Sequence, residues 1–348
     1  MELNFKKDNG PVDQVIQELI GLLGDIPRPE IVREMIIASL KAGQEDDGAV
    51  DLKLMNASLK EMRFTAKAFS SYRHTRKIAV FGSARTRPEE TIYKMAISLG
   101  QKLAASGYMV ITGGGHGIMH AAHEGAGPEY SFGVNIRLPF EQKSNPVIEG
   151  NPRSITYKYF FNRKVAFMKE SDAIVLFPGG FGTLDEGMEA LTLVQTGKRN
   201  PVPILLVDEP EGTYWAKWTE FVEETLLLQG YISKSDLALF EKIDSADDVV
   251  ERIKRFYSRY HSLRYIGNFL VIRLRSGISQ HKVEDLKSRF SEILTPQGDI
   301  YLSGPLPEEM DEPKIRNLPR LVLDFDRKHF AGLKALIDSI NSDPLLKQ

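Results

Sequence analysis

Apolar residues in the middle of the chain occur in short, uninterrupted runs that alternate with longer stretches of helical periodicity, such as residues 88–106. The runs are rich in β-branched residues and are bounded by glycine or proline, as expected of strands buried on both faces. This alternation predicts an α/β fold, a Rossmann-like doubly wound parallel sheet covered by helices. The predicted strands are KIAVFG (77–82), YMVITG (108–113), SFGVNI (131–136), DAIVLF (172–177) and VPILLV (202–207).

Different patterns flank this region. Apolar residues recur at helical spacing through the first part of the chain, without a strand pattern. The last part has two strand candidates, each followed by a helical pattern, and SRYHSLRY (258–265) before it is expected to be a solvated linker. The predicted divisions are an N-terminal helical region (1–76), a Rossmann-like domain (77–261) and a small α+β C-terminal domain (262–348).

Composition narrows the classes of function. The chain has 348 residues, a net charge of −2 and no cysteine, which excludes disulfides, thiolate metal sites and a cysteine nucleophile. The near-neutral charge argues against a broad nucleic-acid-binding surface. No apolar run approaches the ~20 residues that span a bilayer, and the first residues lack the apolar core of a signal peptide. We therefore expect a cytoplasmic protein without nucleic-acid or membrane partners.

Three glycine-containing loops follow predicted strands. They begin at Gly82 and Ser83, at ITGGGHG (111–117) and at FPGGFGTLDE (177–186). Ligands of open α/β sheets bind beyond the carboxyl ends of the strands, and the start of a helix favours anions. Two of these loops lead into helices, so the pattern predicts a phosphate-bearing ligand. The alternative is that the loops are only tight strand-to-helix turns. Neither of the two loops that lead into helices has a standard nucleotide-binding motif.

The third loop also carries a family resemblance. PGGFGTLDE (178–186) resembles the Pro-Gly-Gly-x-Gly-Thr-x-x-Glu motif of the LOG family. This family comprises cytokinin riboside 5′-monophosphate phosphoribohydrolases and bacterial nucleotide nucleosidases, and many members are labelled "possible lysine decarboxylase". The resemblance extends over about residues 77–228 and includes GGGHGIMHAAHEGA and FNRKVAFMKESDAIVLFPGGFGTLDE.

The resemblance implies hydrolysis of the N-glycosidic bond of a nucleoside 5′-monophosphate, such as AMP or GMP, to free base and ribose 5-phosphate. It implies no cofactor and no metal, and a homo-oligomer. Arg163 and Glu186 match the family's catalytic residues, whereas Phe161 stands where the family often has histidine. The residues expected to bind substrate are Gly82, Ser83, Gly113, Gly114, Gly115, Lys164, Gly179, Gly180, Phe181, Gly182, Thr183, Leu184, Asp185 and Thr192.

The chemistry of the reaction suits Glu186. It lies three residues after Thr183, one helical turn from the loop that would hold phosphate. A carboxylate there can stabilise an oxocarbenium-like centre or activate water, whereas Asp185 points to another face. Arg163 can hold phosphate or ribose hydroxyls through its fixed set of donors, or steer the leaving base. The alternatives are a helix-dipole glutamate and a surface ion-paired arginine.

Other functions stay open at this point. A non-catalytic nucleotide or molybdenum-cofactor binding or sensor protein is the main alternative, and a DNA-processing role is a weaker one. His116, His120 and His123 include a metal-like spacing, but we expect a phosphate-side or helix-surface role. Nothing marks a Schiff-base lysine of the kind that the decarboxylase label would require.

Overall fold

The computed structural model describes residues 10–45, 48–139, 143–309 and 313–342, and the chain groups into two compact units, Met1–Phe64 and Thr65–Gln348. In the first unit, Arg33 forms a largely buried 2.7 Å ion pair with Asp13. The buried apolar side chains there are Ile16 and Ile37, so its described part has a small core. Its helices are α1 (Pro11–Leu23), α2 (Pro29–Glu45) and the first part of α3 (Ala49–Ser70).

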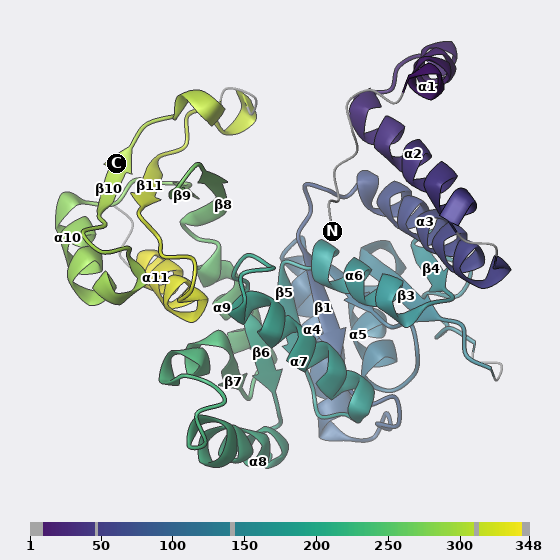
Figure 1. Cartoon of the computed structure of the whole chain (residues 1–348). Helices are drawn as coiled ribbons and strands as arrows, with labels where there is room; N and C mark the ends of the chain where they lie inside the picture. The colour runs from purple at the N-terminus through teal and green to yellow at the C-terminus, as the bar shows by residue number, and fades with distance from the viewer. Residues whose placement is uncertain (1–9, 46–47, 140–142, 310–312, 343–348) are drawn as a thin grey trace. The chain divides into compact units, whose positions relative to one another are not determined.

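The second unit contains a seven-stranded parallel sheet in the order β4-β3-β2-β1-β5-β6-β7 (Figure 1). The chain moves outward from β1 to β4 and then returns to the other side of β1, so the strand order reverses at the β1–β5 pair. This arrangement confirms the α/β, Rossmann-like doubly wound fold. The strands are β1 (Lys77–Phe81), β2 (Met109–Thr112), β3 (Ser131–Ile136), β4 (Ser154–Tyr157), β5 (Ala173–Leu176), β6 (Ile204–Val207) and β7 (Glu241–Ile243).

Helices cover both faces of this sheet because the side chains of each strand alternate between them. Ile78 and Val80 of β1 face one hydrophobic core, and Ala79 and Phe81 face the other. The first core includes residues of α4 (Thr91–Ala105), α5 (Ile118–Ala126) and α9 (Ala246–Phe256). The second includes residues of α6 (Phe160–Glu170), α7 (Phe181–Gln195) and α8 (Tyr214–Phe221).

Two strands were not predicted from the sequence. β4 and β7 are the edge strands of the sheet, and each pairs with one neighbour only in the described structure. β4 alternates exposed and buried positions, and β7 has only three residues, none of them fully buried. Neither therefore contains the continuous apolar run that marks the central strands.

The C-terminal part of the second unit contains helices and an antiparallel sheet in the order β10-β11-β9-β8, and a separate α+β domain at 262–348 stays a prediction. The expected solvated linker at 258–265 was wrong, because β8 begins within it and both Arg259 and Tyr260 are buried. The same hydrophobic cluster contains residues of α9 and of this sheet, so the two share a core. The elements are β8 (Tyr260–Ile266), β9 (Phe269–Leu274), α10 (Gln280–Arg289), β10 (Ile300–Ser303), β11 (Arg320–Leu323) and α11 (Phe330–Ser342).

Close backbone contact fixes α5 against α4. A Cβ at Gly100 of α4 would stand 2.2 Å from the carbonyl oxygen of Ala122, and one at Gly125 of α5 would stand 2.0 Å from that of Ile97. Both distances are far below van der Waals contact, so only glycine allows this spacing. The start of α5, which adjoins the loop after β2, is positioned by this contact.

We predict that Gly100→Ala destabilises the fold by about 1–3 kcal/mol or more, because the added methyl group forces the two helices apart. Gly43→Ala in α2 is the matched control, since a Cβ there meets nothing within 4 Å. That substitution should leave stability unchanged or raise it by up to about 1 kcal/mol through better helix propensity. Urea unfolding of both variants measures the difference, and equal stability of the two would contradict the packing account.

Candidate active site

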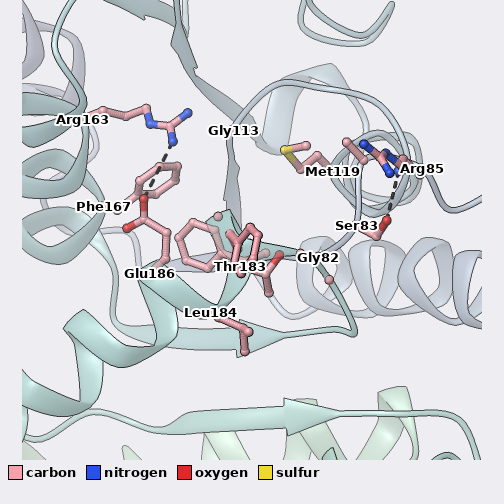
Figure 2. A pocket seen from close by; sticks show the side chains of 16 residues that line it. Gly82, Ser83, Arg85, Gly113, Met119, Arg163, Phe167, Thr183, Leu184 and Glu186 are labelled. Carbon is pink, nitrogen blue, oxygen red and sulfur yellow. Dashed lines mark hydrogen bonds and ion pairs between the residues drawn. The ribbon is translucent and has the colours of Figure 1, made fainter. Parts of the chain in front are cut away.

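A pocket of about 780 Å³ lies beyond the carboxyl ends of β1 and β5 (Figure 2). Three groups of residues line it: 81–85 at and after the end of β1, 179–184 with Glu186 at the start of α7, and Arg163 with Phe167 from α6. Gly113 and Met119 complete the described wall. The pocket therefore occupies the point at which the strand order reverses, where ligands of such sheets bind.

One end of the pocket is built from backbone and hydroxyl groups. A Cβ at Gly179 would stand 2.2 Å from Thr183 Oγ1 and 3.0 Å from the Ser83 nitrogen. Glycine at position 179 therefore allows both Thr183 and Ser83 to pack closely against it. The Ser83 N–H donates to the Pro178 carbonyl at 3.0 Å. The Tyr214 hydroxyl of α8 donates to the Gly179 carbonyl at 2.6 Å and fixes the loop from the other side.

This end also contains the start of α7. Gly180 is the N-cap residue, without a side-chain cap, and Thr183 is the third helical residue rather than the cap. The first N–H groups of a helix have no acceptor within it and carry a partial positive charge. A Cβ at Gly180 or Gly182 would meet no described atom within 4 Å, so packing does not explain either glycine. The space beside them is suited to an anion.

The other end of the pocket holds the two expected catalytic side chains. Arg163 Nη2 lies 3.8 Å from Glu186 Oε1 (Figure 2). Their side chains are 15% and 3% exposed, so both charges are largely removed from water. Within the described part of the chain, Arg163 Nε and Glu186 Oε2 have no hydrogen-bond partner. A buried polar atom without a hydrogen-bond partner costs folding free energy, and a polar ligand in the pocket would supply the missing hydrogen bonds.

Burial raises the pKa of Glu186 from 4.5 to about 7. The nearby cations Lys164 and Arg163 oppose this shift but do not cancel it. Burial also lowers the pKa of Arg163, against the effect of the Glu186 carboxylate. A carboxyl group with a pKa near neutrality can exchange a proton at physiological pH, as a catalytic acid or base must.

Lys164 binds the carboxylates of α7 and does not line the pocket. Its ammonium lies 2.5 Å from Glu189, 2.9 Å from Asp185 and 3.9 Å from Glu186. In this structure Lys164 therefore connects α6 to α7 and adds positive charge behind Glu186.

The loop after β2 contributes less to the pocket than its glycines suggest. Gly113 lines the pocket, whereas Gly114 and Gly115 are buried behind it. Both of their carbonyl groups accept hydrogen bonds from Asn145, and Gly114 has φ +71° with its missing Cβ directed at Asn135. Gly114 is therefore explained by a tight, packed turn, whereas Gly115 shows only the buried carbonyl hydrogen bond.

The sequence-predicted residues thus fall into two groups. Those that line the pocket are Gly82, Ser83, Gly113, Arg163, Gly179, Gly180, Phe181, Gly182, Thr183, Leu184 and Glu186. Those that do not are Gly114, Gly115, Lys164, Asp185 and Thr192. Thr192 donates its hydroxyl hydrogen bond to Met188 of its own helix. Substrate contact by any of these residues stays a prediction.

Sequence reasoning missed several lining residues, notably Arg85, Met119 and Phe167. Phe167 lies one helical turn after Arg163, and that spacing was a usable signal. Phe161, which stands where the family often has histidine, is 47% exposed and does not line the pocket. Arg85 lies in the first loop, FGSAR (81–85), two residues after Ser83, but no motif marks it as a ligand-binding residue.

The three histidines, His116, His120 and His123, have different environments. His116 is exposed, and His120 contacts the Tyr93 hydroxyl at 3.1 Å. His123 is fully buried, with hydrogen-bond contacts to Thr112, Phe132 and Asn145, and burial lowers its pKa to about 4. His123 is therefore a neutral core residue, which corrects the expected surface or phosphate-side role. The described residues contain no cluster of three or more metal-ligating side chains.

Known proteins of one family resemble part of this chain. The family model described as "Possible lysine decarboxylase" matches residues 116–253. Cytokinin riboside 5′-monophosphate phosphoribohydrolase LOG of Oryza sativa subsp. japonica is 28% identical over 192 residues, covering 53% of this chain and 75% of that protein. The enzyme LOG3 of Arabidopsis thaliana is 27% identical over 187 residues, covering 52% and 83%. These matches confirm the LOG-family resemblance, and they support a nucleotide phosphoribohydrolase at the level of the family.

Solved structures resemble about half of the chain. The molybdenum cofactor carrier protein of Chlamydomonas reinhardtii has a TM-score of 0.37 and 20% identity, covering 52% of this chain and 97% of that one. DNA processing protein A of Helicobacter pylori has a TM-score of 0.36 and 18% identity, covering 51% and 79%. At these scores neither likeness indicates a function for this chain. Among the described helices, none combines the length and apolar character needed to cross a membrane.

We predict that Glu186→Gln stabilises the protein at pH 8 by up to about 3 kcal/mol. The pKa of Glu186 is higher in the folded state, so the folded protein loses stability as the pH rises from about 4.5 through about 7. Glutamine keeps the size and removes the buried charge. Between pH 5 and 9, the melting temperatures of the two proteins should be closest near pH 5, move apart as the pH rises toward 7, and stay apart by a steady amount above it. A constant difference across this range would assign the effect to packing.

Proposed function

We propose that the chain hydrolyses the N-glycosidic bond of nucleoside 5′-monophosphates, giving free base and ribose 5-phosphate. One observation carries this proposal: a buried Glu186 carboxylate beside Arg163 lies in the same pocket as the start of α7. The first feature suits a developing cation, and the second suits a phosphate. A nucleoside monophosphate carries both groups, separated by one ribose. The LOG-named relatives support the same reaction class.

In the proposed reaction, water attacks C1′ of the ribose while the bond from C1′ to the base nitrogen breaks. The base leaves with the bonding electron pair and takes up a proton, and the water oxygen becomes the 1-hydroxyl of ribose 5-phosphate. The transition state resembles an oxocarbenium ion. The Glu186 carboxylate stabilises that positive charge or takes the proton from water.

Arg163 is assigned to orientation and binding at the sugar end. Its contact with Glu186 Oε1 leaves Oε2 without a hydrogen-bond partner in the described structure. The guanidinium has donors to spare, and ribose hydroxyls or the base are suitable acceptors. Phosphate binding at the other end would then position C1′, so that binding energy contributes to the chemical step.

The apolar part of the lining suits a nucleobase. Met119, Phe167 and Leu184 contribute apolar surface to the pocket, and aromatic and thioether groups pack well against flat rings. This lining favours a purine such as that of AMP or GMP by size, without a specific hydrogen-bond pattern. The preferred base is therefore best determined by assay.

Assembly and location are separate proposals. Helix α6 exposes Phe160, Phe161 and Val165, and α7 exposes Met188. Exposed apolar side chains in such number are typical of surfaces that become covered on association. This surface supports the expected homo-oligomer, and a cytoplasmic location likewise stays a prediction.

The direct test is incubation of the protein with a panel of nucleoside monophosphates, followed by chromatography for free base and ribose 5-phosphate. We expect release from AMP or GMP. Binding of these nucleotides without release of base from any purine or pyrimidine monophosphate would instead favour a non-catalytic nucleotide-binding protein.

We further predict that Glu186→Gln lowers kcat for AMP by about 10²–10⁴-fold, with little change in AMP affinity. The removed charge matters chiefly when positive charge develops at C1′, so its loss acts on the transition state. Asp185→Asn is the matched control, because Asp185 is 59% exposed and does not line the pocket. Single-turnover cleavage and AMP binding measure both effects. Equal losses in the two variants would indicate damage to α7, and near-normal cleavage by Glu186→Gln would remove its catalytic role.

A further inference from the structure

We infer that Arg85 is the side chain that holds the 5′-phosphate of the substrate and makes the pocket selective for phosphomonoesters over nucleosides. The inference rests on the proposed function for the substrate class. It assigns a specificity role to a residue that lies outside the family motif.

The pocket contains two arginines at different ends. Arg163 lies beside Glu186, and Arg85 lies beside Ser83 across the pocket (Figure 2). Glu186 is the one carboxylate among the described lining residues. A phosphate dianion placed at Arg163 would stand next to that carboxylate and be repelled by it. Arg163 is therefore a poor phosphate site, although either arginine can bind phosphate in principle.

Arg85 has the opposite environment. Its backbone N–H donates to Ser83 Oγ at 3.1 Å, so its position is tied to the loop after β1. Ser83 in turn lies at the closely packed contact with Gly179 and Thr183. Within the described residues, the Arg85 guanidinium forms no ion pair within 4.0 Å. Arg85 is thus a cation that lines the same pocket as the start of α7, on a loop that contacts Gly179, and it has no carboxylate partner in the described structure.

A neighbouring hollow is a less suitable place for the phosphate than the pocket. A second hollow of about 450 Å³ shares Ser83 and Gly179 with the pocket, but it is also lined by Glu90, Asp208 and Glu209. A phosphate there would meet an excess of negative charge. The helix start, the Ser83 and Thr183 hydroxyls and Arg85 therefore converge on a phosphate from the pocket side only. Charge-assisted contacts to arginine are among the strongest that a phosphate makes.

The test compares Arg85→Gln and Arg85→Lys with Arg87→Gln. Arg87 is an exposed arginine two residues away that does not line the pocket, so it controls for loss of surface charge. Arg85 is itself exposed, so its substitution should leave the fold intact. We expect Arg85→Gln to lower kcat/KM for AMP by about 10- to 100-fold. The ratio of kcat/KM for AMP to that for adenosine should fall by a similar factor, with Arg85→Lys intermediate.

Calorimetric titration with AMP separates this inference from the proposed reaction. If the protein cleaves no nucleotide, weaker AMP binding by Arg85→Gln, with normal binding by Arg87→Gln, still supports the phosphate role. Inorganic phosphate should compete with AMP in the wild type and less so in Arg85→Gln. An unchanged AMP-to-adenosine ratio in an active protein, or equal losses in Arg85→Gln and Arg87→Gln, would overturn the inference. So would AMP affinity that does not change with Arg85→Gln.

Discussion

The parallel pairing of β1 with β5 is the constraint on which the pocket depends. It brings the loop after one strand against the loop after the other, although the two are nearly 100 residues apart in the chain. The Ser83 main chain uses both of its polar groups in this junction, donating to Pro178 and accepting from Ile118 at 3.0 Å each. Three segments are thereby joined at one residue. The position of this end of the pocket thus follows from backbone hydrogen bonds rather than from the choice of side chains.

The buried carboxylate of Glu186 is suited to chemistry but lowers the stability of the fold. Glu186 lies in the second turn of α7, so the same helix supplies partial positive charge at its start and a buried carboxylate one turn further on. Such a carboxylate costs folding free energy when it is ionised. Lys164 reduces this cost from behind α7 without occupying the pocket. A site of this kind is maintained by the surrounding packing of α6 and α7 on the sheet.

Much of the fold was predictable because five central strands carry continuous apolar runs, whereas the edge strands β4 and β7 do not. The pocket lining was predictable at Gly180 and Gly182, where a Cβ would meet no described atom within 4 Å. It was not predictable at Gly114, because glycine density alone does not distinguish a ligand-facing turn from one packed against a side chain such as Asn135. Residues such as Arg85 enter the pocket only through tertiary contacts. The hydrophobic periodicity of a sequence predicts secondary structure but not such tertiary contacts.

The hydrogen bond between α8 and the loop after β5 has a practical consequence. The chain contains two tryptophans, Trp215 and Trp218, and both lie on α8 directly after Tyr214, whose hydroxyl binds the Gly179 carbonyl. Their rings contact each other with centroids 5.8 Å apart, and the indole of Trp215 is buried and bonded to the Val207 carbonyl. All of the tryptophan emission of this protein therefore originates on α8, whose first residue, Tyr214, is hydrogen-bonded to a loop that lines the pocket. Occupancy of the pocket can be followed optically in the native chain, without attaching a dye.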